Sequence, residues 1–592
     1  MKKKIYKKYL AGMLATAMVL TGVPAQQTQA AQKVKLSSKK ITLEVGMSKK
    51  VTLKNNKKKT AWKIVTGKKY IQIKNKKKNS VTITAVKEGK AKVQVKAGTK
   101  KYTCTVIVKG ESAPGVTGTP GVTNSPVPTQ NPDVTNGPDV TQDPSVTSAP
   151  DGKNENDVAI LRKIIQEQRG KGATVSEDLD SYQYKWEDGR LVSIDWDTKA
   201  LQGELSVSGL DSLTHLNCIR NELSSLDVSK NTALTELACE GNQLSSLDVS
   251  KNTALTYLDC GRNNLRSLDV SVNTALTYLK CNSNQLSSLD VSVNTALTKL
   301  DCSFNELSSL DVSVNTALTY LNCDYSELSS LDVSKNTALD YLNCCNNELS
   351  NLDVSKNTAL TDLSCGGNQL SSLDVSKNTA LTDLECGAND LSRLDVSVNT
   401  ALTDLACYAN DLSSLDVSKN TALTDLNCAD NELSSLDVSK NTALTYLKCD
   451  YNELSNLDVS KNIALTYLNC ADNQLSSLDV SKNTVLTALQ CANNELSSLD
   501  ASKNTALTEL DCADNQLSSL DVSKNTVLDY LDCGRNNLKS LNVSQNTALT
   551  SLYCKNNQLT SLDVSKNTEL EELSCDDDVT VTGRENTKLD AE

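Results

Sequence analysis

A cysteine at every twenty-first position constrains this chain more than any other feature. Eighteen cysteines follow one another at this constant spacing, from Cys218, Cys239 and Cys260 to Cys554 and Cys575. A fixed period of this length is typical of a solenoid, in which each repeat buries its apolar side only against its neighbours. The sequence therefore predicts a repeat array with these cysteines in a buried column, which we call the cysteine ladder.

One repeat, Leu255 to Ala275, contains the same pattern twice. Its first half reads LxxLxCxxNxL and its second half reads LxxLDVSxN. In the first half, Leu258 and Cys260 are two residues apart, so both point inward from a short strand. Asn263 turns the chain inward, where its amide can bond to backbone groups of adjacent turns. We expect extended backbone on both long sides of the array, few helices, and less curvature than in an array with helices on its convex side.

This repeat resembles the leucine-rich repeat signature, with cysteine at the central apolar position. The doubled pattern in units of 21 residues is similar to the nested leucine-rich repeats of bacterial surface proteins, over about residues 205–578. The pattern is interrupted locally by Ser326, Ala501 and Asp578. The resemblance implies a β-rich repeat solenoid with a parallel sheet, and a protein that binds a partner.

The first 30 residues have the pattern of a secretory signal peptide. Five lysines lie between Lys2 and Lys8, an apolar run extends from Tyr9 to Val23, and small residues surround Ala25 and Ala30. Such a segment is removed on export. We therefore expect an exported protein, secreted or associated with the cell surface, with no membrane span after cleavage.

Residues 32–109 alternate apolar and polar side chains over short runs, which predicts a small β-sandwich. The segment resembles the group 2 bacterial Ig-like domains through Leu43-Glu-Val-Gly46, Trp62 and Ala85-Val-Lys-Glu-Gly89. That resemblance implies a surface spacer or an adhesive module. Cys104 lies in the middle of a predicted strand, so we expect it in the core.

The charge of this module is opposite to that of the remaining chain. Residues 32–109 contain 24 lysines and two acidic residues, whereas residues 110–592 contain 32 basic and 70 acidic residues. Opposite fields attract different partners. The basic module suits an anionic cell-envelope polymer, and it lacks the interleaved arginines and aromatics that bind nucleic acid.

Three further segments complete the predicted organisation. Residues 110–151 are rich in Pro, Thr and Gly and have no aromatics, so they form an extended linker. Residues 152–204 contain a helical pattern over 157–168, after the capping candidates Asn154 and Asn156. We expect this segment to be the N-terminal cap that shields the array from water. Residues 579–592 are a C-terminal tail.

The cysteine ladder predicts packed free thiols rather than a metal site. A metal site needs clustered ligands, but each ladder cysteine is alone in its turn and His215 is the single histidine. Disulfides are the alternative, since an exported protein permits them. In-register side chains would place their Cβ atoms near the strand spacing of about 4.8 Å, beyond the usual disulfide range. Cys345 is off the ladder, and we expect it to be exposed.

The aspartate of the LDVS segment recurs 16 times, from Asp227 to Asp563, with Asn542 interrupting the series. A solvated face is one interpretation, because a lysine such as Lys251 often follows three residues later. Stacked carboxylates that bind calcium are the alternative. No glycine-rich calcium turn accompanies these aspartates, which favours the solvated face.

Positions that vary between repeats indicate where a ligand binds. The residue three places before each ladder cysteine lies on the exposed face of the predicted sheet. Tyrosines at this position flank an acidic block of four turns, and tyrosine is enriched at recognition surfaces. The alternative is that tyrosine merely suits strands and that the stripe reflects duplication. The candidate ligand-binding residues are Tyr257, Tyr278, Tyr320, Tyr341, Asp362, Asp383, Asp404, Asp425, Tyr446 and Tyr467.

The sequence carries no catalytic signature. GxSxG, HExxH and a phosphate-binding glycine loop are absent, and one histidine offers little for proton transfer. We predict no enzyme activity, no cofactor and no metal. The favoured function is an adhesin-like binding protein that uses its repeats for protein recognition. A module for carbohydrate or cell-wall polymers and a structural spacer are the alternatives.

Overall fold

A computed structural model defines two compact units. The predicted signal peptide (1–30) and linker (110–151) lie outside the described residues. The residues that the structure describes are 35–36, 40–44, 48–54, 60–74, 76, 80–87, 89–97, 100–109 and 152–587.

The first unit consists of two four-stranded sheets with the orders β1-β3-β6-β5 and β2-β8-β7-β4. Val51, Trp62, Val93 and Cys104 pack in a shared core, which confirms the buried position of Cys104. Most neighbours are antiparallel, whereas β2 and β8 are parallel. The strands are β1 (Lys35–Leu36), β2 (Lys40–Glu44), β3 (Ser48–Lys54), β4 (Thr60–Thr66), β5 (Ile71–Lys74), β6 (Ser80–Ala85), β7 (Gly89–Ala97) and β8 (Lys100–Lys109).

The second unit begins with helix α2 (Glu155–Gly170), as the sequence predicts. Asn154 is the N-cap, and its side chain accepts a hydrogen bond of 3.1 Å from the Asp157 backbone N–H. Leu161 and Ile165 are buried in the same core as the repeats that follow. The helix therefore covers the apolar end of the array. Among the described residues, no helix has the length and apolar character needed to cross a membrane.

One long sheet runs along the array, with one strand from each repeat. Strand β9 is antiparallel to β10, and all later pairs of neighbouring strands are parallel. Equivalent residues of successive repeats are in register, as in the pairing of Leu237 with Leu258 and of Leu258 with Leu279. Its strands are β9 (Tyr184–Glu187), β10 (Arg190–Asp195), β12 (His215–Asn217), β14 (Glu236–Ala238), β15 (Tyr257–Asp259), β16 (Tyr278–Lys280), β17 (Lys299–Asp301), β18 (Tyr320–Asn322), β19 (Tyr341–Asn343), β20 (Asp362–Ser364), β21 (Asp383–Glu385), β22 (Asp404–Ala406), β23 (Asp425–Asn427), β24 (Tyr446–Lys448), β25 (Tyr467–Asn469), β26 (Ala488–Gln490), β27 (Glu509–Asp511), β28 (Tyr530–Asp532), β29 (Ser551–Tyr553) and β31 (Glu572–Ser574).

The second half of each repeat is less extended than expected. Strand pairs on this side occur only at the two ends of the array, as β11 (Gln202–Ser206) with β13 (Glu222–Asp227), and β30 (Ser561–Asp563) with β32 (Thr580–Thr582). Between them the chain makes successive turns, such as the hydrogen bonds from Asn273 N to Val270 O and from Leu276 N to Asn273 O. A short 3₁₀ helix, η2 (Arg584–Asn586), follows β32.

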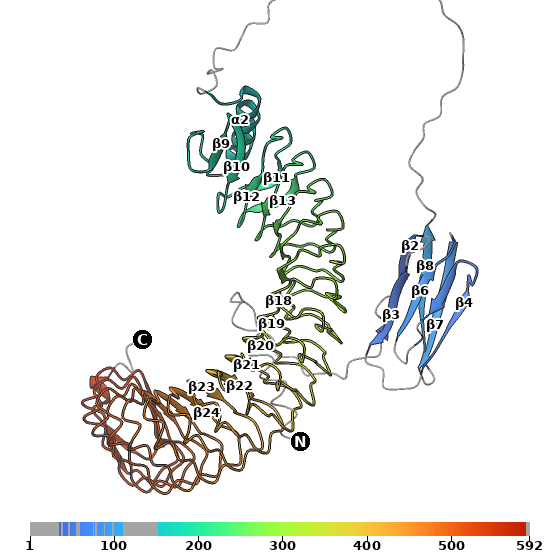
Figure 1. Ribbon diagram of the computed structural model, residues 1–592. Coiled ribbons are helices and arrows are strands. Elements are labelled where there is room, and N and C mark those ends of the chain that lie inside the picture. Colours follow the sequence, from blue (N-terminus) through green and yellow to red (C-terminus); the bar gives the residue numbers. More distant parts are fainter. Residues whose placement is uncertain are drawn as a thin grey trace, which may run out of the picture. The chain divides into compact units, whose positions relative to one another are not determined.

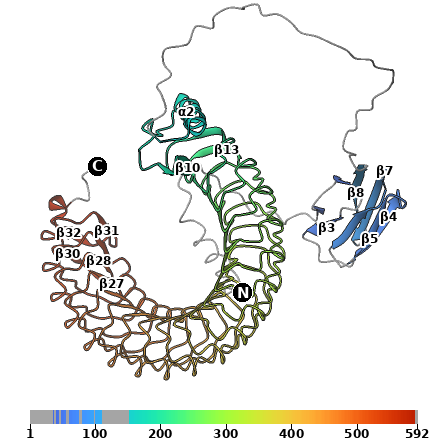
Figure 2. The same cartoon turned by 45° about the horizontal axis from the view of Figure 1, so that its top comes forward.

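The array of repeats is curved (Figure 2). Figure 2 shows the repeats following a wide arc, and in Figure 1 the short strands lie along its inner side. The continuous ladder of strands holds the inner side at the spacing of a sheet, whereas the turns on the other side occupy more room. The exposed face of the sheet is therefore concave.

Leucines and ladder cysteines fill one continuous core. Seventeen of the 18 ladder cysteines are buried, and Cys575 in the last turn is partly exposed. The structure holds all 20 cysteines as free thiols. The expectation for Cys345 is wrong: this residue is only 5% exposed, because the turns on either side of it cover the position after the ladder cysteine.

The asparagine that recurs in the first half of the repeats joins neighbouring repeats. Asn263 donates from Nδ2 to the carbonyls of Cys239, Cys260 and Gly261, at 3.0, 3.2 and 2.9 Å. Its Oδ1 accepts a hydrogen bond of 3.0 Å from Leu244 N. These four hydrogen bonds help to satisfy buried backbone groups of adjacent repeats.

Candidate functional site

The tyrosines predicted to bind a ligand lie on the concave face of the sheet and form stacked pairs. Each pair joins adjacent strands, with ring centroids 4.4–4.5 Å apart and nearly parallel planes. Such offset stacking contributes about 0.5–1.5 kcal/mol beyond area burial. Three rigid aromatic platforms result, and the pairs are Tyr257 with Tyr278, Tyr320 with Tyr341, and Tyr446 with Tyr467.

The four predicted aspartates occupy consecutive strands between two of these platforms. Asp362, Asp383, Asp404 and Asp425 are in register from β20 to β23. Each of the first three accepts a hydrogen bond of 2.6–2.8 Å from the hydroxyl of the preceding threonine. Burial raises the pKa of Asp383, and the charges of its two neighbours raise it further. The block therefore holds mutually repelling carboxylates.

A shallow hollow of about 290 Å³ lies over this block. Tyr341 and Tyr446 stand at its two ends, and the shorter aspartates and small side chains such as Ser364 and Ala406 line it between them. We call this hollow the acidic trough. Five strand steps of about 4.8 Å separate the two tyrosines, so the trough is roughly 24 Å long. Eight of its lining residues are Tyr341, Asp362, Asp383, Glu385, Asp404, Asp425, Asn427 and Tyr446, and none of the residues that line it is cationic.

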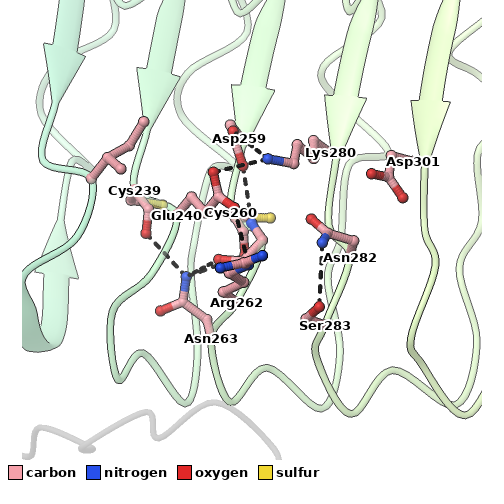
Figure 3. A network of polar contacts seen from close by, with 12 residues as sticks. Cys239, Glu240, Asp259, Cys260, Arg262, Asn263, Lys280, Asn282, Ser283 and Asp301 are labelled. Carbon is pink, nitrogen blue, oxygen red and sulfur yellow. Dashed lines mark hydrogen bonds and ion pairs between the residues drawn. The ribbon is translucent and has the colours of Figure 1, made fainter. Parts of the chain in front are cut away.

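Two carboxylates near the start of the array, Glu240 and Asp259, are paired with cations. Figure 3 shows Lys280 between Glu240 and Asp259, with Nζ–oxygen distances of 2.8 and 3.4 Å. Arg262 lies 3.5 Å from the other oxygen of Glu240. Burial raises the pKa of Asp259 to about 6, while Lys280 acts in the opposite direction. The acidic trough lacks any equivalent of Lys280, so its negative field is open to a partner.

The LDVS aspartates have a structural role. The Oδ1 atom of Asp248 accepts a hydrogen bond of 2.9 Å from Ser250 N, and the same contact recurs along the series. Asn542, which interrupts the series, keeps it at 3.0 Å to Ser544 N. These hydrogen bonds lower the pKa of the aspartates. In the described part of the chain, no three His, Cys, Asp or Glu residues are grouped so that they could hold a metal ion.

A second hollow was not predicted from the sequence. It has a volume of about 480 Å³ and lies beyond the carboxyl ends of β18–β22, where the chain leaves the sheet. Its walls come from the first and second positions after the ladder cysteines, including Tyr325 and Tyr408. The available signal was the run of small residues Cys345, Gly366, Gly367, Gly387 and Ala388 between these tyrosines. We call this hollow the strand-end pocket.

The cysteine ladder is a feature that this chain shares with a protein of known structure. A solved structure of the functional domain of InlJ from Listeria monocytogenes, described as including a cysteine ladder, is 43% identical to this chain. The match covers 52% of this chain and 69% of that one, with a TM-score of 0.51. The chain belongs to the internalin-type leucine-rich repeat proteins. The resemblance inferred from the repeat pattern is thereby confirmed for the array.

The solved structure of a TDR receptor shares the fold of this internalin-type protein. This receptor is 19% identical, and the match covers 66% of this chain and 81% of that one with a TM-score of 0.57. The internalin inlF from Listeria monocytogenes is 24% identical, over 45% of this chain and 82% of that one with a TM-score of 0.41. No protein-family model matches, and a search among curated proteins found no match.

Proposed function

We propose that this internalin-type protein is an exported, adhesin-like binding protein whose acidic trough recognises a protein with a cationic surface. The observation that carries the proposal is the in-register block from Asp362 to Asp425 between two stacked tyrosine pairs, with no cation in the trough. Export rests on the signal-peptide pattern of residues 1–30. The repeat architecture supports a binding role, since solenoids offer long concave surfaces.

Electrostatics favour a cationic partner. Four carboxylates about 4.8 Å apart repel one another. Burial is the main cause of the raised pKa of Asp383, and the charges of Asp404 and Asp362 raise it further. A basic protein surface relieves this repulsion and accelerates association. The flanking tyrosine pairs offer apolar area with polar tips, the composition of binding hot spots. Charge thus steers the partner, and the tyrosines anchor it.

Calorimetric titration of the full chain with blocked peptides tests this proposal. Acetyl-(Gly-Lys)6-amide should bind, whereas acetyl-(Gly-Ser)6-amide and acetyl-(Gly-Glu)6-amide should not. Replacing the four trough aspartates by Asn should weaken binding of the lysine peptide by tenfold or more, because each close charge pair contributes on the order of 1 kcal/mol. Tyr320→Ala with Tyr341→Ala should weaken it less. Equal binding of all three peptides to the wild-type chain would contradict a cationic partner.

We further propose that the basic unit of residues 32–109 holds the protein to anionic envelope polymers. The support is its composition of 24 lysines and two acids. Retention on cells should fall steeply above about 0.15 M salt, where the Debye length is about 8 Å. A variant lacking residues 32–109 should be released at low salt. Equal retention of that variant would eliminate this part of the proposal.

A further inference from the structure

The strand-end pocket has the size of a ligand site. Its volume of about 480 Å³ lies within the range of small-ligand pockets, about 300–1,000 Å³. Tyr325 and Tyr408 are its two large side chains, and they come from turns four repeats apart. Five of the other lining residues are small, which leaves the space open, and these are Cys345, Gly366, Gly367, Ala388 and Ala409.

Glycines are required for this shape. A Cβ atom added at Gly387 would lie 2.5 Å from the ring of Tyr408, so this ring rests directly against the Gly387 backbone. A Cβ atom at Gly366 would lie 3.3 Å from Glu385 Oε1 and 3.0 Å from the Gly387 carbonyl oxygen. Side chains at these two positions would displace the aromatic wall and the Glu385 carboxylate.

The pocket carries negative charge without a cation of its own. Asp324, Glu385 and Asp390 line it, and no lysine or arginine does. Asp324 Oδ1 accepts a hydrogen bond of 3.2 Å from Asn346 Nδ2, yet burial still raises the pKa of Asp324. Burial also raises the pKa of Tyr408 to about 12, so this phenol stays neutral at physiological pH. Carboxylates beside neutral tyrosine rings form an environment that stabilises an organic cation.

We propose that the strand-end pocket binds one lysine or arginine side chain of the protein partner that lies in the acidic trough. This inference rests on the proposed function and deepens it. Glu385 lines both hollows, so a partner in the trough has the pocket directly at its side. The aliphatic stem of the basic side chain would pack against the rings of Tyr325 and Tyr408. Its charged head would reach Asp324 and Glu385 in charge-assisted hydrogen bonds.

Variants confined to the pocket test this inference with the peptide acetyl-(Gly-Lys)6-amide and its arginine counterpart. Asp324→Asn removes a carboxylate, Tyr408→Leu removes the ring face but keeps bulk, and Cys345→Met fills the space. Each should weaken binding about fivefold, the effect of losing roughly 1 kcal/mol. Glu453→Gln is the matched control, because it removes one exposed carboxylate outside both hollows and should change binding less than twofold.

The outcomes separate the pocket from the trough. If the four-aspartate variant loses binding while all three pocket variants match Glu453→Gln, the pocket inference is wrong and the proposed function stands. If the wild-type chain binds neither peptide at millimolar concentration, both are wrong. Circular dichroism and thermal unfolding of each variant confirm that the array is folded. A folded pocket variant with weakened binding to the basic peptides supports the inference.

Discussion

The ring of Tyr341 stacks on the ring of Tyr320, with centroids 4.4 Å apart and planes inclined by 6°. On its other side Tyr341 is in register with Asp362, the first carboxylate of the acidic trough. Burial raises the pKa of both tyrosines, so their hydroxyls stay neutral beside the aspartates. A rigid pair of neutral tyrosine rings therefore adjoins the row of charged aspartates. The rings and the carboxylates can contact different parts of one partner.

Thiol reactivity should report the buried ladder. Burial raises the pKa of Cys218, Cys365 and Cys407 to about 12, which suppresses the reactive thiolate. Titration with a thiol reagent should find about one accessible group in the native protein, Cys575, and nearly all 20 after denaturation. A protein isolated with most of its cysteines oxidised would contradict the packing described here.

Ser326→Asn should stabilise the array. In most other repeats the asparagine at this position makes four hydrogen bonds, as Asn431 does with Leu412, Cys407, Cys428 and Ala429. The buried hydroxyl of Ser326 makes none. Restoring the amide should raise the free energy of unfolding by about 2 kcal/mol.

The measurement for Ser326→Asn is a denaturant midpoint together with hydrogen exchange at the flanking turns. Repeat arrays can unfold in parts, so the local protection is the more specific readout. Ser326→Ala serves as the control and should leave both quantities nearly unchanged. Unaltered protection of Leu307 N in the asparagine variant would show that the series of asparagine hydrogen bonds does not extend through this turn.

Asp450→Asn should stabilise the protein at neutral pH. Asp450 is 6% exposed and its Oδ1 atom has no hydrogen-bond partner. Burial raises its pKa to about 6, with Asp472 and Asp430 adding to the shift and Lys448 opposing it. The pKa of an aspartate in the unfolded chain is about 3.9. Between about pH 3.9 and pH 6 the folded state therefore holds a proton on Asp450 that the unfolded state has lost. Stability from this group is thus present at low pH and lost as pH rises through about 6.

Thermal unfolding as a function of pH checks this prediction. The variant should unfold at a higher temperature than the wild type at pH 7.5 and at the same temperature at pH 4. Below that, both should lose stability, since the lowered pKa values of LDVS aspartates such as Asp458 stabilise the fold only while these groups are charged. An equal difference between variant and wild type at pH 7.5 and pH 4 would show that the charge is not the cause.

Strict periodicity made the array predictable. The spacing of Leu258, Cys260 and Asn263 defines the strand, the core and the turn of a repeat, and register then places every equivalent residue. For the same reason the column from Tyr341 through Asp383 to Tyr446 could be assigned to one exposed face before the fold was known. Internal repetition reduces the problem to one unit and its contacts with the next.

Features that depend on differences between repeats were harder to predict. The strand-end pocket arises because Gly366, Gly367 and Gly387 fall beside one another between two tyrosines, and no single repeat contains this pattern. Cys345 is buried because adjacent turns cover it, which its place outside the ladder does not indicate.

The salt dependence of partner binding tests the central claim most directly. Binding of acetyl-(Gly-Lys)6-amide to the full chain should be measured between 0.05 and 0.5 M salt, for the wild type and for the variant with Asn at Asp362, Asp383, Asp404 and Asp425. If the trough is the recognition surface, the wild-type affinity falls steeply with salt and the variant shows a weaker, nearly flat dependence. Parallel slopes and equal affinities for the two proteins would show that the recognition surface lies elsewhere.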